Sequence, residues 1–312
     1  MIDVLLAGIG AGALDRWLGD RSRVDPEPWY KDWVDSVEQR FNGGQVFQGV
    51  IALLLVLVPV LVLVVLLRWV AWQFGMLTGF ALDIVLLFFC IRIDGLHQSA
   101  NRIGHALKRG RLLEAQSLLR AFSGHSVLRE DEAVIAEAAV ETILCRANTQ
   151  VIAPLFWFAL LGPVGSVMQM LTRIVRQRWQ GTGDRFGQFG LPVQQVYCAI
   201  NWLPARCSAM CFAMVGNFSD AVHGWRDTPS GWCNSETVVA TTGLAALQIE
   251  RAGQEAGEEM EPDEESSAQA IDPGYQHADS ASVRRAVALA WRSVLFLGVL
   301  AIVMSLASWL GV

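Results

Sequence analysis

The ionisable residue with the most unusual position in the sequence is Asp83, which lies near the middle of an apolar run from Phe74 to Ile91. A carboxylate inside a transmembrane segment is costly, and it commonly marks a path for ions, protons or substrate. A small transporter that uses Asp83 is therefore one hypothesis, although it needs a continuous polar pathway that the sequence does not display. The structural alternative is that Asp83 hydrogen-bonds in the interior of a helix bundle.

A second candidate site is the stretch from Val140 to Leu171, where a charged, alanine-rich helix runs directly into a strongly apolar segment. Four residues prevent this segment from forming one plain helix: Pro154, Gly162, Pro163 and Gly165. Irregular backbone is tolerated at membrane depth only where protein or a water-filled cavity covers it. The sequence therefore predicts a covered site at this break.

The cysteines and histidines do not form a recognisable metal site. The six cysteines contain no CxxC pair, so we expect buried free thiols, with disulfides or zinc ligation as the less favoured alternative. They are Cys90, Cys145, Cys198, Cys207, Cys211 and Cys233. His97 and His105 are eight residues apart without a third ligand nearby, so contact with solvent or lipid headgroups is expected.

The elements that must position these residues are membrane helices. The chain is 53% hydrophobic with a mean hydropathy of +0.36, which is too apolar for an ordinary soluble protein. Val46 to Leu67 has Gln48 as its only strongly polar side chain, and as a helix it rises ~33 Å and crosses the hydrocarbon core. The net charge of -6 argues against nucleic-acid binding.

The second span, Phe74 to Ile91, follows the first after a short linker, so the two form a hairpin with both flanks on one side. Basic residues on those flanks place them in the cytoplasm by the positive-inside rule. Asp94 to Gln150 then predicts two short antiparallel helices that meet at Gly110, and a third helix that starts near Glu130. Before the first span, an amphipathic helix is expected at the interface, with Trp29 and Trp33 on its apolar side.

The middle of the chain leaves its topology open. Gln150 to Leu171 either crosses the membrane once, re-enters on the same side, or pairs with a second apolar stretch, Val196 to Phe218, which Asn201, Pro204 and Arg206 interrupt. Thr237 to Ile249 predicts one further helix. Glu250 to Ser282 is acidic and almost without large apolar residues, so a disordered linker is expected before the final span, Ser293 to Val312.

Several stretches resemble the CobD/CbiB superfamily, the membrane-embedded adenosylcobinamide-phosphate synthases. The central one is VETILCRANTQVIAPLFWFALLGPVG, from Val140 to Gly165. The others are LDRWLGD at Leu14 to Asp20, RIDGLHQSANRIGHALKRGRLLEAQ at Arg92 to Gln116 and NWLPAR at Asn201 to Arg206. The resemblance covers nearly the whole chain in the same order. It implies activation of a carboxylic acid with ATP and formation of an amide with an amino-alcohol phosphate.

Two stretches are more similar still to AmpE, the branch of this superfamily named for β-lactamase regulation. They are APLFWFALLGPVG, from Ala153, and NWLPARCSAMCFAMVGNFSDAVHGW, from Asn201. This resemblance implies a protein of the bacterial inner (plasma) membrane that crosses it several times. It also implies a partner, protein or small molecule, in peptidoglycan recycling.

The sequence departs from the synthase pattern at most of its acidic positions. Carboxylates would hold Mg²⁺ in such an enzyme, and cationic or amide groups would hold phosphates. Glu141 matches an acid of the pattern VExxxEN, but positions where the resemblance implies further acidic or amide residues hold other types here. These positions are Cys145, Arg146, Thr149, Arg173, Arg176, Tyr197 and Cys198.

The remaining candidates for ligand binding are few. Glu141 and Arg206 either pair with each other or contact a polar ligand, because buried charges need partners. Three others match motifs of the superfamily, and Asp83 completes the set. The full set of predicted ligand-binding residues is Glu141, Arg206, Asn201, Asp15, Asp20 and Asp83. We expect no catalytic and no metal-binding residues.

The sequence thus predicts an all-α, polytopic helical membrane protein with about four transmembrane helices, a cytoplasmic helical region and broken or re-entrant helices. The expected regions are 1–45 interfacial, 46–93 hairpin, 94–150 cytoplasmic, 151–249 broken segments, 250–285 linker and 286–312 final span. The favoured function is a non-enzymatic, AmpE-like sensory or accessory role in the cell-wall response to β-lactams, without a cofactor and with the lipid bilayer as a partner. The alternative is the ATP- and Mg²⁺-dependent amide-forming synthase.

Overall fold

The computed structural model describes residues 27–91, 94–124, 131–179, 188–226, 228, 231–249 and 276–309. Regular secondary structure in these residues is helical, apart from an isolated bridge between Ile249 and Gln276. Four helical stretches are long and apolar enough to cross a membrane, which confirms the expected all-α membrane protein: Val46–Gln73, Met76–Lys108, Glu132–Leu161 and Leu191–Val215. Asp15 and Asp20 lie outside the described residues.

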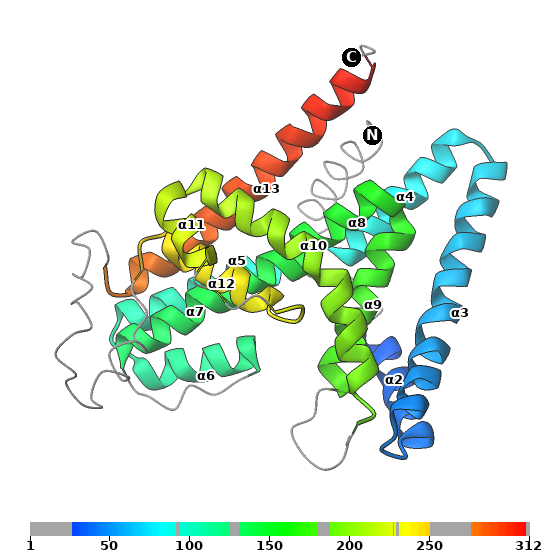
Figure 1. Ribbon diagram of the computed structural model, residues 1–312, viewed down its shortest axis with the longest axis horizontal. Helices are drawn as coiled ribbons and strands as arrows, with labels where there is room; N and C mark the ends of the chain where they lie inside the picture. Colours follow the sequence, from blue (N-terminus) through cyan, green and yellow to red (C-terminus); the bar gives the residue numbers. More distant parts are fainter. Residues whose placement is uncertain are drawn as a thin grey trace.

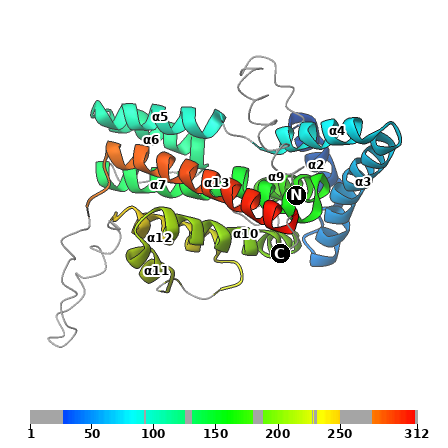
Figure 2. The ribbon, with the colours of Figure 1, turned by 90° about the horizontal axis from the view of Figure 1, so that it is seen from above.

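The helices form two groups, as Figures 1 and 2 show. The first holds α2 (Glu27–Phe41), α3 (Val46–Gln73), α4 (Met76–Cys90), α8 (Ala153–Leu161) and α9 (Pro163–Trp179). The second holds α5 (Asp94–Lys108), α6 (Leu112–Ser123), α7 (Glu132–Ala147), α11 (Phe218–Arg226) and α12 (Ser235–Ala246). Each group has its own apolar core, and α10 (Leu191–Val215) contributes to both.

The first group carries the surface expected of membrane helices. Helix α3 is apolar around its whole circumference, and Leu54, Leu63 and Leu66 are each more than half exposed. Such a helix needs lipid on its outer side, because water would meet a continuous apolar surface. Helix α2 packs on α3 and α9 through Tyr30 and Val34, whereas the predicted apolar face included Trp29, which is 69% exposed.

The broken segment forms a helical hairpin. A short π-helix, η1 (Asn148–Ile152), continues α7 into α8, and the chain then reverses at Gly162, whose φ of +68° favours glycine. Helix α8 has 9 residues and rises ~14 Å, too little to cross a bilayer alone. Helix α9 packs closely along α8 and returns the chain. The chain therefore reverses direction within Gln150 to Leu171 instead of running straight through it, and the re-entrant topology stays a prediction.

The hairpin closes through Gly165, and this contact gives a test of the packing. A Cβ atom at Gly165 would lie 2.5 Å from the backbone oxygen of Trp157, so Gly165→Ala must push α9 away from α8. Overpacking of this kind costs about 1–3 kcal/mol of unfolding free energy, which thermal unfolding in detergent would measure. The control is Gly298→Ala, where nothing lies within 4 Å of the added Cβ and stability should be kept. Equal stability of the two variants would contradict the close approach.

The second group contains the two short helices predicted around Gly110, and α7 begins next to Asp131, whose side chain caps it by accepting from the amide of Ala133. Helix α10 is continuous through Pro204, although an interruption was expected there. Helix α11 was not predicted. Helix α12 corresponds to the further helix expected from Thr237.

The last helix, α13 (Ser280–Trp309), begins earlier than the predicted final span at Ser293. Its first half packs on α5 and α7 through Val283, Ala286 and Ala290, so the predicted linker to residue 285 was too long. Asp279 precedes the helix and accepts hydrogen bonds from the amide and hydroxyl of Ser282, both at 2.7 Å. Against the effect of burial, which raises it, these bonds and Arg285 hold the pKa of Asp279 below its usual value. Residues 250–275 lie outside the described part of the chain.

Candidate functional site

A cavity of about 380 Å³ lies where the two groups of helices meet, and we call it the junction pocket. Six elements line it: α2, α5, α6, α7, η1 and α9. Apart from Ser99, the polar side chains are cationic or amide groups, and the described lining contains no carboxylate. The lining residues are Lys31, Gly95, Ser99, Arg102, Leu118, Ala121, Phe122, Arg146, Gln150, Arg173 and Gln177.

The break in the membrane segment is what brings this pocket together. Gln150 stands in η1 at the start of the hairpin, and Arg173 stands on α9 where the hairpin returns. Both side chains are nearly buried, with residue exposures of 7% and 6%. Gln177 follows Arg173 by four residues, so the two lie on one face of α9.

Two arginines of the junction pocket are held differently. Arg146 of α7 stacks over the ring of Phe122 at 4.2 Å and donates to the Phe122 carbonyl oxygen. Arg173 lies close enough to the buried Cys90 of α4 for its charge to act there. Guanidinium groups bind phosphate and carboxylate groups through two parallel hydrogen bonds, and a site with few water contacts strengthens such bonds. The junction pocket is therefore suited to an anionic ligand.

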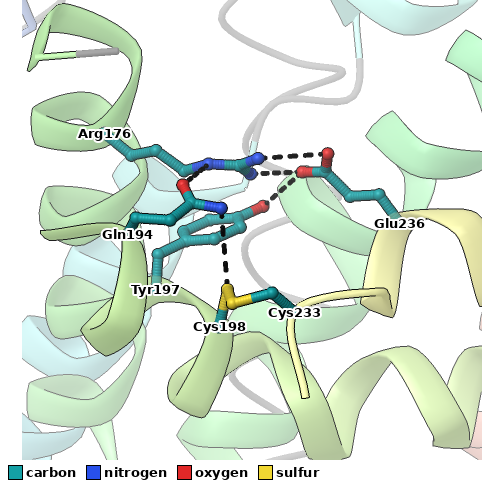
Figure 3. The surroundings of a disulfide bond; sticks show 6 residues. All are labelled: Arg176, Gln194, Tyr197, Cys198, Cys233 and Glu236. Atoms are coloured by element: carbon teal, nitrogen blue, oxygen red, sulfur yellow. Dashed lines mark hydrogen bonds and ion pairs between the residues drawn. A yellow bond between two sulfur atoms is a disulfide. The ribbon is translucent and has the colours of Figure 1, made fainter. Parts of the chain in front are cut away.

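A second polar cluster, drawn in Figure 3, joins α9, α10 and α12 beside the junction pocket. Arg176 forms a two-pronged ion pair with Glu236, and its Nε donates to Gln194 at 3.1 Å. The hydroxyl of Tyr197 donates to the same carboxylate at 3.0 Å, while its ring lies 4.0 Å from the guanidinium carbon of Arg176. Arg176 follows Arg173 by one helical turn, so this cluster fixes the part of α9 that carries Arg173.

The disulfide next to this cluster was not expected from the sequence. Cys198 of α10 bonds to Cys233, which precedes α12, and Gln194 donates to the Cys198 sulfur at 3.6 Å (Figure 3). The prediction that these two cysteines are free thiols was wrong, because contact between α10 and α12 brings together residues 35 apart in the sequence. Cys90, Cys145, Cys207 and Cys211 are free, as predicted.

Comparison with known proteins identifies one family over most of the chain. Residues 8–290 match the family described as CobD/Cbib protein. The chain belongs to the CobD/Cbib family. A protein from Stutzerimonas stutzeri, named cobalamin biosynthesis protein CobD, is 30% identical over 255 residues, which cover 80% of this chain and 82% of the relative.

Two further relatives carry the same name. The one from Halalkalibacterium halodurans is 30% identical over 217 residues, 68% of this chain and 67% of the relative. The one from Chromobacterium violaceum is 26% identical over 250 residues, 77% and 78% of the two chains. No solved structure matches the chain significantly.

These findings correct the favoured functional interpretation. The resemblance to the superfamily is confirmed, but the AmpE branch is not, and the relatives named for cobalamin biosynthesis contradict the regulatory, non-enzymatic role in the β-lactam response. The expected partner in peptidoglycan recycling depended on that role. A lipid environment is supported by the four apolar helices.

Among the predicted site residues of this CobD/Cbib protein, Asp83 forms an ion pair with Arg68. Arg68 near the end of α3 meets it across the hairpin, with Nε 3.3 Å from one carboxylate oxygen and Nη2 3.4 Å from the other. A Cβ atom at Gly162 would lie 3.1 Å from Arg68 Nη1, so this guanidinium also packs against the turn between α8 and α9. Asp83 does not line the junction pocket; its position favours the structural alternative.

Asn201, Arg206 and Glu141 are not brought together at one point. Asn201 is fully buried on α10, where its side-chain oxygen accepts from Asn148 of η1 at 3.2 Å. Arg206 stacks on the ring of Trp202, one turn earlier on its own helix, at 4.2 Å and donates to its carbonyl oxygen at 3.1 Å. The pairing of Arg206 with Glu141 and ligand roles for the three residues stay predictions.

The magnesium ion that the synthase resemblance implies does not fit the described residues. Mg²⁺ prefers carboxylate oxygens, but Glu236 already accepts from Arg176 and Tyr197. Within the described residues, no group of three or more His, Cys, Asp or Glu side chains is arranged to hold a metal ion. The chemistry below is therefore derived from the cationic side chains alone.

The sequence contained a signal for the junction pocket that was interpreted incorrectly. Arg146, Arg173 and Arg176 stand at positions where the resemblance implies acids or amides, and we expected the loss of those residues to mean loss of the site. The structure places the first two in the junction pocket and the third in the cluster beside it. Three of the seven departures from the pattern are arginines, and these three pointed to a cationic site.

Proposed function

We propose that this chain is a membrane-bound enzyme of cobalamin biosynthesis that forms an amide bond, of the adenosylcobinamide-phosphate synthase type. Membership of the CobD/Cbib family supports the pathway. The observation that carries the reaction type is the junction pocket, with four cationic side chains and two amides around one cavity. The substrates of such a reaction are a carboxylic acid and a phosphorylated amino alcohol, and both carry anionic groups that this lining suits.

The pocket also suits the chemistry of amide formation. A carboxyl group must first be activated, and phosphorylation by ATP turns its oxygen into a leaving group. The amine nitrogen then forms the C–N bond, the C–O bond to the phosphoryl group breaks, and the nitrogen loses a proton. Negative charge grows on the phosphoryl oxygens in both steps, and Arg146 and Arg173 are placed to stabilise it.

We further infer that the protein crosses the bacterial inner membrane several times and opens its junction pocket towards the cytoplasm. The four apolar helical stretches support repeated crossing. Basic residues on α5, α6 and the returning end of α9 support the cytoplasmic side by the positive-inside rule. Phosphorylated substrates are available on that side without having to cross the bilayer.

The proposal is tested with the purified protein in detergent, given ATP, a corrinoid carboxylic acid and an amino-alcohol phosphate. Release of ADP should require the corrinoid acid, and formation of the amide, followed by mass spectrometry, should require both organic substrates. ADP release without the corrinoid acid, or no amide with all three present, would overturn the proposal.

A substitution at the rim of the junction pocket checks that the reaction occurs there. Lys31→Gln removes one cationic group of the lining, so KM for the phosphorylated amine should rise roughly 10-fold, since charged hydrogen bonds contribute about 1.5–3 kcal/mol. Lys108→Gln is the matched control, because Lys108 is exposed on α5 and lines no described cavity. Equal KM values for both variants would place substrate binding elsewhere.

A further inference from the structure

A second cationic cavity lies on the outer side of the helical pair α5–α6, and we call it the hairpin groove. It has a volume of about 450 Å³ and is lined by Arg102, His105, Ala106, Arg109, Glu114 and Leu118. Arg102 and Leu118 also line the junction pocket, so the two cavities adjoin. Arg102 therefore lies between two cavities whose linings both carry mainly positive charge.

The basic residues of the hairpin groove follow one face of α5 and continue into the turn after it. Arg102, His105 and Arg109 are spaced by three and four residues, which places them one above another on the helix. The backbone positions of Arg102 and Arg109 are separated by ~10 Å along the helix axis. A chain of linked phosphates can follow this row and contact successive basic side chains.

The charges of the groove are available for a ligand. Among the described residues, no acid forms an ion pair with Arg102 or Arg109. Glu114 is the only acid in the described lining, and it is paired with Arg111 at 3.2 Å. Both arginines are exposed at the surface, so a soluble ligand reaches them directly.

We propose that the hairpin groove is a second anion site, which binds a linear polyphosphate group beside the junction pocket. Lipid headgroups and soluble polyphosphates share the phosphate chemistry that the groove recognises; the ~10 Å spread of its arginines favours the linked phosphates of a soluble ligand. This site does not depend on the amide-forming role, because its lining and charges stand whether or not the junction pocket is catalytic.

The experiment is calorimetric titration of the full-length protein in phosphatidylcholine nanodiscs with tripolyphosphate. The variant His105→Gln/Arg109→Gln alters the groove only, and its affinity should fall roughly 10- to 100-fold at one site. Arg120→Gln is the matched control, because Arg120 is an exposed arginine of α6 outside both cavities, and it should bind as the unaltered protein does. Unchanged affinity in the groove variant, or an equal loss in Arg120→Gln, would overturn the proposal.

Two further measurements distinguish lipid headgroups from a soluble ligand, and the hairpin groove from the junction pocket. When phosphatidylglycerol is added to the nanodiscs, tripolyphosphate should still bind at the groove in a way that depends on Arg109. Loss of this binding would assign the groove to lipid headgroups and overturn the proposal of a soluble ligand. Lys31→Gln should leave that binding unchanged, since Lys31 lines only the junction pocket. Failure of the amide-forming reaction with retained groove binding would thus reject the proposed function and keep this site.

Discussion

Asp83→Asn is expected to remove about 3 kcal/mol from the unfolding free energy, the largest loss of stability from a single substitution discussed here. The change leaves Arg68 charged within the membrane group of helices and deprived of the carboxylate that lies 3.3 Å away. Removing one partner of a fully buried ion pair costs about 3–5 kcal/mol, and the lower end of that range is expected because the Arg68 side chain is 35% exposed. Chemical unfolding in detergent, followed by circular dichroism, would measure the loss.

The double variant Arg68→Leu/Asp83→Leu separates the effect of an unpaired charge on stability from the effect of altered packing. It removes both charges, so most of the lost stability should return, as happens when a buried pair is replaced by apolar residues. Asp35→Asn is the matched control, because Asp35 pairs with Arg178 at 3.0 Å in a more exposed position and should cost less than about 1 kcal/mol. If Asp83→Asn is as stable as the unaltered protein, the pair does not stabilise the hairpin, and the transport hypothesis should be tested by flux into proteoliposomes.

The sequence predicted those features that depend on local hydropathy. The spans from Val46 and Phe74 appear as α3 and α4, since a long apolar run has few stable arrangements other than a membrane helix. The two helices around Gly110 follow from local periodicity in the same way. Features that depend on contacts between distant residues were missed, such as the disulfide between Cys198 and Cys233.

The hairpin of α8 and α9 shows why the sequence left the topology open. Gly162 and Pro163 indicated a break, but a break allows both a bent crossing and a reversal. Whether the chain bends or reverses depends on whether α9 can lie against α8, and the absence of a side chain at Gly165 permits this contact. That packing also brings Arg173 to the level of Gln150, so the junction pocket depends on a tertiary contact and could not be read from residue spacing.

The junction pocket lies at the part of the chain where the sequence predicted a site, and its lining is cationic where the synthase resemblance implied carboxylates. Reading Val140 to Leu171 as a site followed from the broken backbone, and the junction pocket does use residues at both its ends. Carboxylates were taken as the mark of activity, so the loss of most acids of the synthase pattern suggested an inactive protein. Arg146 and Arg173, which stand where that pattern implies asparagine, were counted as further departures. In a binding site for anions, the same replacements supply charge of the required sign.

Arg173→Gln is expected to weaken binding of the phosphorylated substrate in the junction pocket by roughly 30- to 100-fold. Arg173 is 6% exposed and lies among other cationic residues, so its hydrogen bonds to an anion form where water competes little. Glutamine keeps a donor but loses the charge and the paired geometry of the guanidinium, which accounts for about 2–3 kcal/mol, or a factor of ten for each 1.4 kcal/mol. Calorimetric titration with the amino-alcohol phosphate measures the loss.

Arg178→Gln, on the same helix but outside the described lining, should retain the affinity, and thermal unfolding of both variants separates binding from folding. A weakened Arg173→Gln with unchanged unfolding temperature locates the anion at the returning end of the hairpin, whereas an unaffected affinity would remove Arg173, and with it the broken segment, from the binding site.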